Sequence, residues 1–304
     1  MITEVSKLTL RNKSLRNAVR RIFREEFEAV REPSDLKFML LHKLMSPFYK
    51  NFDPSQNMFN TISLQTRTGC NHHCRYCPVS NPKVNLYGGA GNGREMDMDL
   101  FRKILEELAR MRFKGIIIPY LMNEPLLDNR IPHLVRMIRE KCPDAFVFVQ
   151  TNGILLDEKF IGESINAGLD EIIINDYSEK RHIISKINRM KISKEHLGHL
   201  TVEKRNQNER LTNRAGSVDI YPTLPAPLEM PCYRPFRQMH VTFDGRCILC
   251  CQDWEFAHVL GDVRSNSLAE IWRNEHYHQL RCSLLKGERV KFPLCSKCDC
   301  GGLM

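Results

Sequence analysis

Cys70, Cys74 and Cys77 lie close together in the spacing C-x3-C-x2-C. Three thiolates can bind three irons of a [4Fe–4S] cluster and leave the fourth iron without a protein ligand, whereas a fourth cysteine would leave the cluster as an electron carrier. A structural zinc site is the alternative, with His72 or His73 as the fourth ligand. Both histidines lie inside the loop, where the chain would have to fold back sharply to let them bind, so we favour the cluster.

The three-cysteine loop, with Tyr76 just before its last cysteine, resembles that of the radical S-adenosylmethionine (SAM) superfamily. The resemblance implies that the open iron chelates the methionine part of SAM and that one electron from the cluster splits the sulfonium to give a 5′-deoxyadenosyl radical. It also implies an external one-electron donor, such as flavodoxin or ferredoxin. Tyr76 matches the aromatic residue near the adenine. Glu124 matches the carboxylate that binds the SAM amino group, with Asn123 in place of a usual glycine.

Apolar runs and amphipathic stretches alternate downstream of residue 58. We expect strands at 59–64, 116–118, 145–150 and 171–175, with helices at 98–112, 130–141 and 157–167 between them, and two further units within 180–225. This alternation predicts a parallel sheet, because each parallel return needs a crossover helix. The fold class is therefore α/β, and the superfamily resemblance implies a partial (βα)6 TIM-like barrel.

Polar residues follow the predicted strands, at the edge where parallel sheets bind ligands. Asn123 and Glu124 follow the second strand, Thr151 and Asn152 the third, and Asp176 the fourth. We expect these five residues to bind the cofactor. The alternatives are an ordinary surface acid for Glu124 and turn chemistry for Asn152.

A second group of cysteines follows residue 230. Asp244-Gly245 between two runs of strand-forming residues predicts a β-hairpin, and a capping box that starts at Ser267 predicts a helix to about 284. These elements resemble the twitch module, a shortened SPASM extension that carries one auxiliary [4Fe–4S] cluster. The expected ligands are Cys232, Cys250, Cys295 and Cys298. A zinc ribbon is the alternative, the choice among Cys247, Cys250 and Cys251 stays open, and Cys300 is read as tail.

These patterns divide the chain into three expected parts. They are an N-terminal helical extension (1–57), the partial barrel (58–228), and a cluster-binding module of a β-hairpin plus a helix (229–304). The glycine-rich segment at 88–93 is not followed by Lys-Ser or Lys-Thr, so it is no P-loop, and we expect a lid or linker there.

Composition narrows the partners. The chain has 304 residues and a formal net charge of +9, but its basic residues are scattered among 36 acids. The most basic stretch, 180–214, has no aromatic residues for base stacking, so nucleic acid is not expected as a partner. The charge instead favours an anionic small-molecule substrate. We find neither a signal peptide nor a run near the roughly 20 apolar residues of a membrane span, and expect a cytoplasmic protein.

A partial barrel with one auxiliary cluster most resembles the aminocyclitol dehydrogenase group, of the 2-deoxy-scyllo-inosamine dehydrogenase type. This resemblance implies oxidation of a secondary alcohol, with hydrogen abstracted from carbon and one electron passed to the auxiliary cluster. Arg214, in an Asn-Arg-Ala-Gly run at 213–216, could hydrogen-bond the substrate. Epimerisation is a rival reaction, with Cys251 or Cys247 as hydrogen donor. Peptide modification is a second rival, and a zinc-bound basic scaffold is a third from another class.

Overall fold

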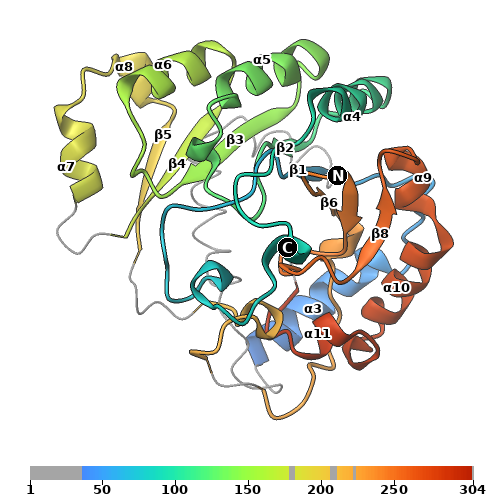
Figure 1. Ribbon diagram of the computed structural model, residues 1–304. Helices are drawn as coiled ribbons and strands as arrows, with labels where there is room; N and C mark the ends of the chain where they lie inside the picture. The colour runs from blue at the N-terminus through green and yellow to red at the C-terminus, as the bar shows by residue number, and fades with distance from the viewer. Residues whose placement is uncertain (1–35, 178–181, 206–210, 222–223, 303–304) are drawn as a thin grey trace.

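The computed structural model describes residues 36–177, 182–205, 211–221 and 224–302, so most of the expected N-terminal extension lies outside the described residues (Figure 1). Its centre is an open, eight-stranded sheet in the order β5-β4-β3-β2-β1-β6-β7-β8. The strands are β1 (Thr61–Leu64), β2 (Ile116–Ile118), β3 (Phe146–Thr151), β4 (Glu171–Asp176), β5 (Leu200–Lys204), β6 (Gln238–Val241), β7 (Arg246–Ile248) and β8 (Val259–Asp262). This is the expected α/β partial barrel.

The sixth parallel strand comes from an unexpected part of the chain. Strands β1 to β5 pair in parallel in sequence order. Two further strand–helix units were expected within 180–225, but the described residues of that range contain only one strand, β5. The sixth position is filled by β6, which pairs in parallel with β1 on the other side. The expected C-terminal hairpin is therefore real, with β7 antiparallel to β6, but its first strand belongs to the barrel sheet.

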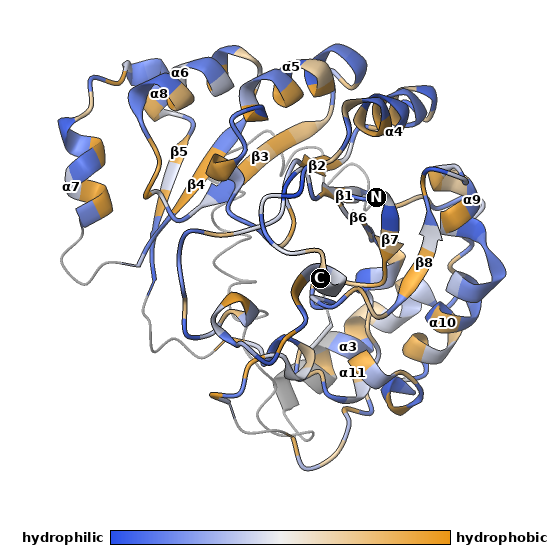
Figure 2. Ribbon diagram, in the orientation of Figure 1, coloured by the Kyte–Doolittle hydropathy of each residue, from blue (hydrophilic) through white to orange (hydrophobic). Residues whose placement is uncertain are grey.

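Amphipathic helices cover the outer face of the sheet (Figures 1 and 2). The crossover helices are α4 (Met98–Arg110), α5 (Ile131–Lys141) and α6 (Glu158–Asn166), with the short α7 (His182–Arg189) and α8 (Lys194–Leu197) before β5. Asp97 caps α4 and Asp157 caps α6, each accepting backbone N–H groups of the first turn. The buried sides of these helices pack on Ile62, Ile117 and Val147, which face outward from the sheet.

The opposite, inner face of the sheet carries polar side chains. Side chains alternate along a strand, so the pairing register decides which residues share a face. Ser63 on β1 lies opposite His240 on β6, and Gln150 on β3 lies opposite Ile173 on β4. Ile172, the neighbour of Ile173 along β4, faces outward, so Ile173 and Gln150 face inward. A polar inner face in a protein of this size marks a place for a ligand rather than a packed core.

The C-terminal elements close the barrel on one flank. Two helices, α9 (Leu268–Arg273) and α10 (Glu275–Leu285), follow β8, and α11 (Pro293–Ser296) precedes the end of the chain. The predicted capping box at Ser267 is present. The single helix expected to 284 is wrong, because Asn274 leaves the helix and its side chain caps α10 by accepting the N–H of Tyr277.

Helix α3 (Leu36–Tyr49) packs beside this flank. The ring of Tyr49 stacks on that of Tyr233 at 4.5 Å between centroids, and the indole N–H of Trp272 donates to the carbonyl of Asn57 at 2.8 Å. These contacts join the described part of the N-terminal extension to the C-terminal module. No helix in the described part of the chain has the length and apolar character of a membrane span.

The close approach of the chain before β1 to the chain before β2 leaves no room for a side chain at Gly115. A Cβ at Gly115 would lie 2.1 Å from the carbonyl oxygen of Asn60 and 2.6 Å from the ring of Phe113. We predict that Gly115→Ala lowers the free energy of unfolding by about 2–4 kcal/mol in a urea titration. Gly162→Ala in α6 is the control, since its nearest neighbour would be 3.9 Å away. It should leave stability unchanged or raise it by up to about 1 kcal/mol; equal losses would contradict the packing described.

Candidate active site between two cysteine sets

The first cysteine loop follows β1 and is supported by the glycine-rich segment at 88–93. The N–H of Gly93 donates to the carbonyl of Thr68 at 3.2 Å, and the hydroxyl of Thr68 donates to the carbonyl of Gly91 at 2.9 Å. The segment is thus hydrogen-bonded to the loop, and its role as a lid or linker stays a prediction.

Tyr87, at the start of this segment, is fully buried and joins three parts of the site. Its hydroxyl accepts the N–H of Gly69 at 3.2 Å and donates to the carbonyl of Met122 at 2.8 Å. Its own N–H donates to the carbonyl of Trp254 at 2.8 Å, in the loop after β7. Tyr87 therefore fixes the first cysteine loop relative to the second cysteine region.

The three thiols of the loop converge on one space. Burial raises the pKa of Cys70 to about 11 and that of Cys74 to about 12, and the charge of Cys77 adds to both shifts. The ring Nδ1 of His72 lies 3.0 Å from the sulfur of Cys74, so this histidine contacts a thiol from within the loop. Cys74 is buried, and Cys70 and Cys77 are half-buried. The charge of Cys77 acts on both other thiols, so the three lie close together and fit the corner of an iron–sulfur cluster, where bound iron would keep them deprotonated.

Glu124 stands beside this loop and is almost completely buried. Its carboxylate accepts hydrogen bonds from the hydroxyl of Thr151, from the N–H of Asn152 at 2.9 Å and from the N–H of Leu126 at 3.1 Å. Its own N–H donates to the carbonyl of Gly69 at 2.9 Å. Burial raises its pKa despite these bonds, and a cationic amino group bound nearby would favour the ionised form.

The other expected cofactor residues lie around Glu124. The side-chain amide of Asn152 donates to Asn71 in the cysteine loop at 2.8 Å. The side-chain oxygen of Asn123 accepts the N–H of Leu121 at 3.1 Å, while its amide nitrogen is buried without a partner among the described residues. These residues are brought together as the sequence predicts, and their cofactor contacts stay a prediction.

Tyr76 and Asp176 differ in placement. Tyr76 is buried beside Tyr177, with 6.1 Å between ring centroids, and Tyr177 stacks on His72 at 5.1 Å. This aromatic group sits over the cysteine loop. Asp176 is the last residue of β4 and shares the outer face of the sheet with Ile174, because side chains alternate along a strand. This placement does not support its predicted contact with the cofactor.

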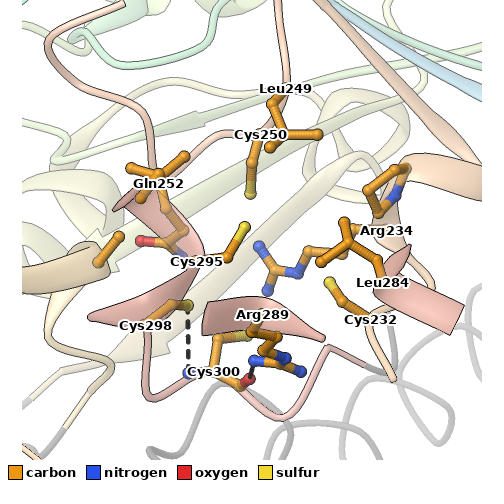
Figure 3. A pocket seen from close by; sticks show the side chains of 13 residues that line it. Cys232, Arg234, Leu249, Cys250, Gln252, Leu284, Arg289, Cys295, Cys298 and Cys300 are labelled. Atoms are coloured by element: carbon orange, nitrogen blue, oxygen red, sulfur yellow. Dashed lines mark hydrogen bonds between the residues drawn. The ribbon is translucent and has the colours of Figure 1, made fainter. Parts of the chain in front are cut away.

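The second cysteine set surrounds a cavity in the C-terminal module (Figure 3). Its lining includes the four expected ligands and one more: Cys232, Cys250, Cys295, Cys298 and Cys300. All are free thiols. Among the described residues no three Cys, His, Asp or Glu side chains lie close enough to hold a single metal ion. Four cysteines around such a cavity fit a fully ligated [4Fe–4S] cluster.

Cys300 was missed by the sequence analysis. It is buried, not a loose tail, and its N–H donates to the sulfur of Cys298 at 3.4 Å. The short spacing Cys298-x-Cys300 was the available signal, because a cysteine two positions from a predicted cluster ligand lies close to the same cluster site.

Two buried arginines, also missed, bring positive charge to this cavity. Arg289 donates to the carbonyls of Met230 at 2.9 Å and Cys300 at 2.7 Å. Arg234 donates to the sulfur of Cys251 at 3.0 Å. Burial lowers the pKa of Arg234, but the neighbouring thiolates outweigh it and hold this pKa well above the ordinary value. Arg234 therefore stays charged beside the thiols.

The choice among the three clustered cysteines now has a geometric basis. Cys250 lines the cavity, whereas Cys247 packs in the apolar core of β7, where burial and then Asp262 raise its pKa. Cys251 contacts Arg234. A hydrogen bond with Cys250, helped by the charge of Arg234, lowers the pKa of Cys251 well below its usual value. Cys251, not Cys247, is thus placed near the candidate site.

The Asn-Arg-Ala-Gly turn (213–216) runs between the two cysteine sets. Asn213 donates to the carbonyl of Lys297 at 2.8 Å, inside the last C-x2-C pair, and Ser217 accepts from Asn81 at 3.1 Å, after the first loop. Arg214 and Ala215 have left-handed backbone angles, φ 51° and 54°, which cost about 1–2 kcal/mol each. These anchors hold the strained turn in place.

The turn carries Arg214 into the space between the sets. The guanidinium charge opposes the rise that burial causes in the pKa of Cys77 and helps to lower that of Cys251. Its Nε is buried without a hydrogen-bond partner among the described residues. One side chain therefore acts electrostatically on both cysteine sets and still has a donor to offer.

Comparison with known proteins supports two functional regions. Residues 64–195 match the profile of the radical SAM superfamily, and residues 232–299 match that of SPASM, an iron–sulfur cluster-binding domain. The chain is 28% identical over 244 residues to the S-adenosyl-L-methionine-dependent 2-deoxy-scyllo-inosamine dehydrogenase of Niallia circulans. That alignment covers 80% of this chain and 93% of the relative.

Solved structures give the same picture. The crystal structure of BtrN in complex with AdoMet and 2-DOIA is 27% identical, with a TM-score of 0.70, and the match covers 80% of this chain and 94% of that one. Native anSMEcpe with bound AdoMet is 14% identical, with a TM-score of 0.53 over 77% of this chain and 88% of that one. The second likeness concerns the fold alone.

We predict that Glu124→Gln weakens SAM binding. Glutamine replaces one carboxylate oxygen with an amide nitrogen, which cannot accept a hydrogen bond, so the bond from either Asn152 or Leu126 is lost. The negative charge that would attract the amino group of SAM is lost as well. Titration calorimetry with SAM should show about a tenfold or greater rise in Kd, corresponding to about 1.4 kcal/mol or more. Glu95→Gln, which removes an exposed partner of Arg67, should leave the Kd unchanged. An unchanged Kd in Glu124→Gln would contradict this role.

Proposed function

We propose that this chain, whose residues 64–195 match the radical SAM superfamily and whose residues 232–299 match a SPASM iron–sulfur cluster-binding domain, dehydrogenates a secondary alcohol of an aminocyclitol-like small molecule. The observation that carries the proposal is the position of Arg214 between the two cysteine sets. A substrate held there lies beside the centre that starts the reaction and the centre that can end it.

The two cofactors divide the chemistry. With SAM and both clusters bound, the first site supplies the radical that removes a substrate hydrogen atom, and the second supplies a one-electron acceptor. The remaining tasks belong to the protein. The substrate must be oriented, water kept away and the hydroxyl proton removed.

Arg214 is suited to orientation. Its planar guanidinium has five donors and stays protonated, so it can bind a hydroxyl oxygen but cannot accept a proton from it. The two-sided anchoring of its turn limits its movement, which favours a fixed donor direction. Arg234, on the wall of the second set, adds to the positive charge of this region. We infer that neutral hydroxyl or anionic groups of the substrate lie here, so the ammonium group of an aminocyclitol would lie away from Arg214 and Arg234. We also infer an external electron donor, such as flavodoxin or ferredoxin, for the first cluster.

Epimerisation is the second candidate, and the position of Cys251 favours it. Its thiol lies among Arg234, His240 and Arg214, on the side where the substrate would bind. A cysteine there can return a hydrogen atom to the substrate radical only as the protonated thiol, which the lowered pKa of Cys251 disfavours, and the thiyl radical left behind needs an electron and a proton to reset. In that reaction the product would be an inverted alcohol and not a ketone.

We predict that Arg214→Gln lowers kcat/KM for ketone formation by about 10- to 150-fold, which corresponds to the loss of a charged hydrogen bond of about 1.5–3 kcal/mol. Arg214→Lys keeps the charge but loses the fork, and it should fall between Gln and the wild type. The assay is ketone formation from 2-deoxy-scyllo-inosamine by mass spectrometry, with iron content measured to confirm both clusters. Wild-type activity in Arg214→Gln would rule out substrate positioning by this residue.

Cys251→Ala separates the two reactions. For a dehydrogenase we expect ketone formation to continue and the product to gain no deuterium from D2O. For an epimerase, the wild type should incorporate deuterium at the inverted carbon, and Cys251→Ala should still form 5′-deoxyadenosine without inverted product. Cys247→Ala is the matched control, because this thiol packs in the core.

A further inference from the structure

The inner wall of the barrel holds polar side chains whose hydrogen bonds are not satisfied by the described residues. Both ring nitrogens of His240, both side-chain amide atoms of Gln252 and the amide nitrogen of Gln65 are buried without a partner there. The three residues come from β6, from the loop after β7 and from the end of β1. Each such atom costs about 1–3 kcal/mol if nothing binds it. His240 and Gln65 lie on the inner face of the sheet by strand alternation, and Gln252 lines the second cysteine cavity. Unsatisfied buried donors and acceptors of this kind point to a ligand.

His240 is the most exceptional of the three. Only 3% of it is exposed, and it lies opposite Ser63 on the inner face of the sheet. It is close enough to Cys251 and Arg234 to respond to their charges, and Arg234 lines the second cysteine cavity. Unlike either arginine, a neutral imidazole can both donate and accept a hydrogen bond.

Oxidation of an alcohol leaves a proton to be removed, and Arg214 and Arg234 cannot accept it. We propose that His240 is the catalytic base that takes the hydroxyl proton of the substrate. The proposal rests on the dehydrogenation proposed above. The carbon-bound hydrogen leaves as an atom to the SAM-derived radical, one electron passes to the auxiliary cluster, and the O–H proton passes to a ring nitrogen of His240. After loss of the hydrogen atom, the electron and the proton, the carbon and oxygen of the alcohol form the C=O double bond of the ketone.

The electrostatics agree with this role. Burial, followed by the charge of Arg234, lowers the pKa of His240, while Cys251 acts in the opposite direction. The ring therefore starts neutral, as a base must, while the same burial and the charge of Arg234 weaken it as a base and Cys251 acts against that weakening. A base placed in this way typically contributes about 10²- to 10⁴-fold to rate.

A stability comparison tests, without any substrate, whether the buried ring of His240 lacks hydrogen-bond partners in the folded protein. Thr242, two residues along the chain, is also buried, but its hydroxyl bonds to Asp244 at 2.6 Å and to the carbonyl of Arg246 at 2.9 Å. In the enzyme with both clusters, Thr242→Val should lower the Tm, whereas His240→Val should leave it unchanged or raise it, because it removes unsatisfied polar atoms. An equal loss in both variants would make His240 a structural residue and overturn the proposal.

The second test uses 2-deoxy-scyllo-inosamine and scyllo-inositol as probes. His240→Gln should form ketone at least 100-fold more slowly than the wild type while 5′-deoxyadenosine still appears, and higher pH should restore part of the rate because hydroxide can replace the base. The same ratio of ketone to 5′-deoxyadenosine as in the wild type would overturn the role of His240 alone. No ketone from either probe with the wild type would instead overturn the proposed function itself.

Discussion

The buried carboxylate of Glu124 is the contact on which the rest of the first site depends. It accepts hydrogen bonds from Thr151 and Asn152 after β3, while its backbone N–H donates to Gly69 in the cysteine loop after β1. Three adjacent strand ends are thus held by one residue. Removing it from water is unfavourable, as its raised pKa shows, and the surrounding donors offset only part of that effect. A positive group bound at this site would stabilise the ionised carboxylate, as the prediction for SAM requires.

Charge balance is the second constraint. Two sets of cysteines, once deprotonated, place several negative charges in the interior of a small protein, and buried charges need partners. Arg234 and Arg289 lie at the second cavity, and Arg214 acts on both sets. The strained turn at 213–216 makes sense in this setting, since its anchors at Lys297 and Asn81 hold a cation where neither strand nor helix could place one.

Local patterns predicted what is local in the structure. The amphipathic helices, the Asp-Gly hairpin, the capping box at Ser267 and the gathering of polar residues at the strand ends all follow from spacing along the chain. The pairing of β6 with β1, far apart in sequence, does not, because parallel pairing leaves no turn signal. His240 was missed for the same reason, because only the assembled sheet shows that it faces inward, whereas Cys300 had a signal in its spacing from Cys298.

The central claim is that two separate cysteine-bound centres act on one substrate. Its most direct test is to measure iron content and products of two variants beside the wild type, which should hold about eight irons. Replacing Cys70, Cys74 and Cys77 with Ala should abolish 5′-deoxyadenosine formation and leave about half of the iron. Replacing Cys295 and Cys298 should leave SAM cleavage and abolish the ketone. SAM cleavage that survives loss of the first three cysteines would contradict the account.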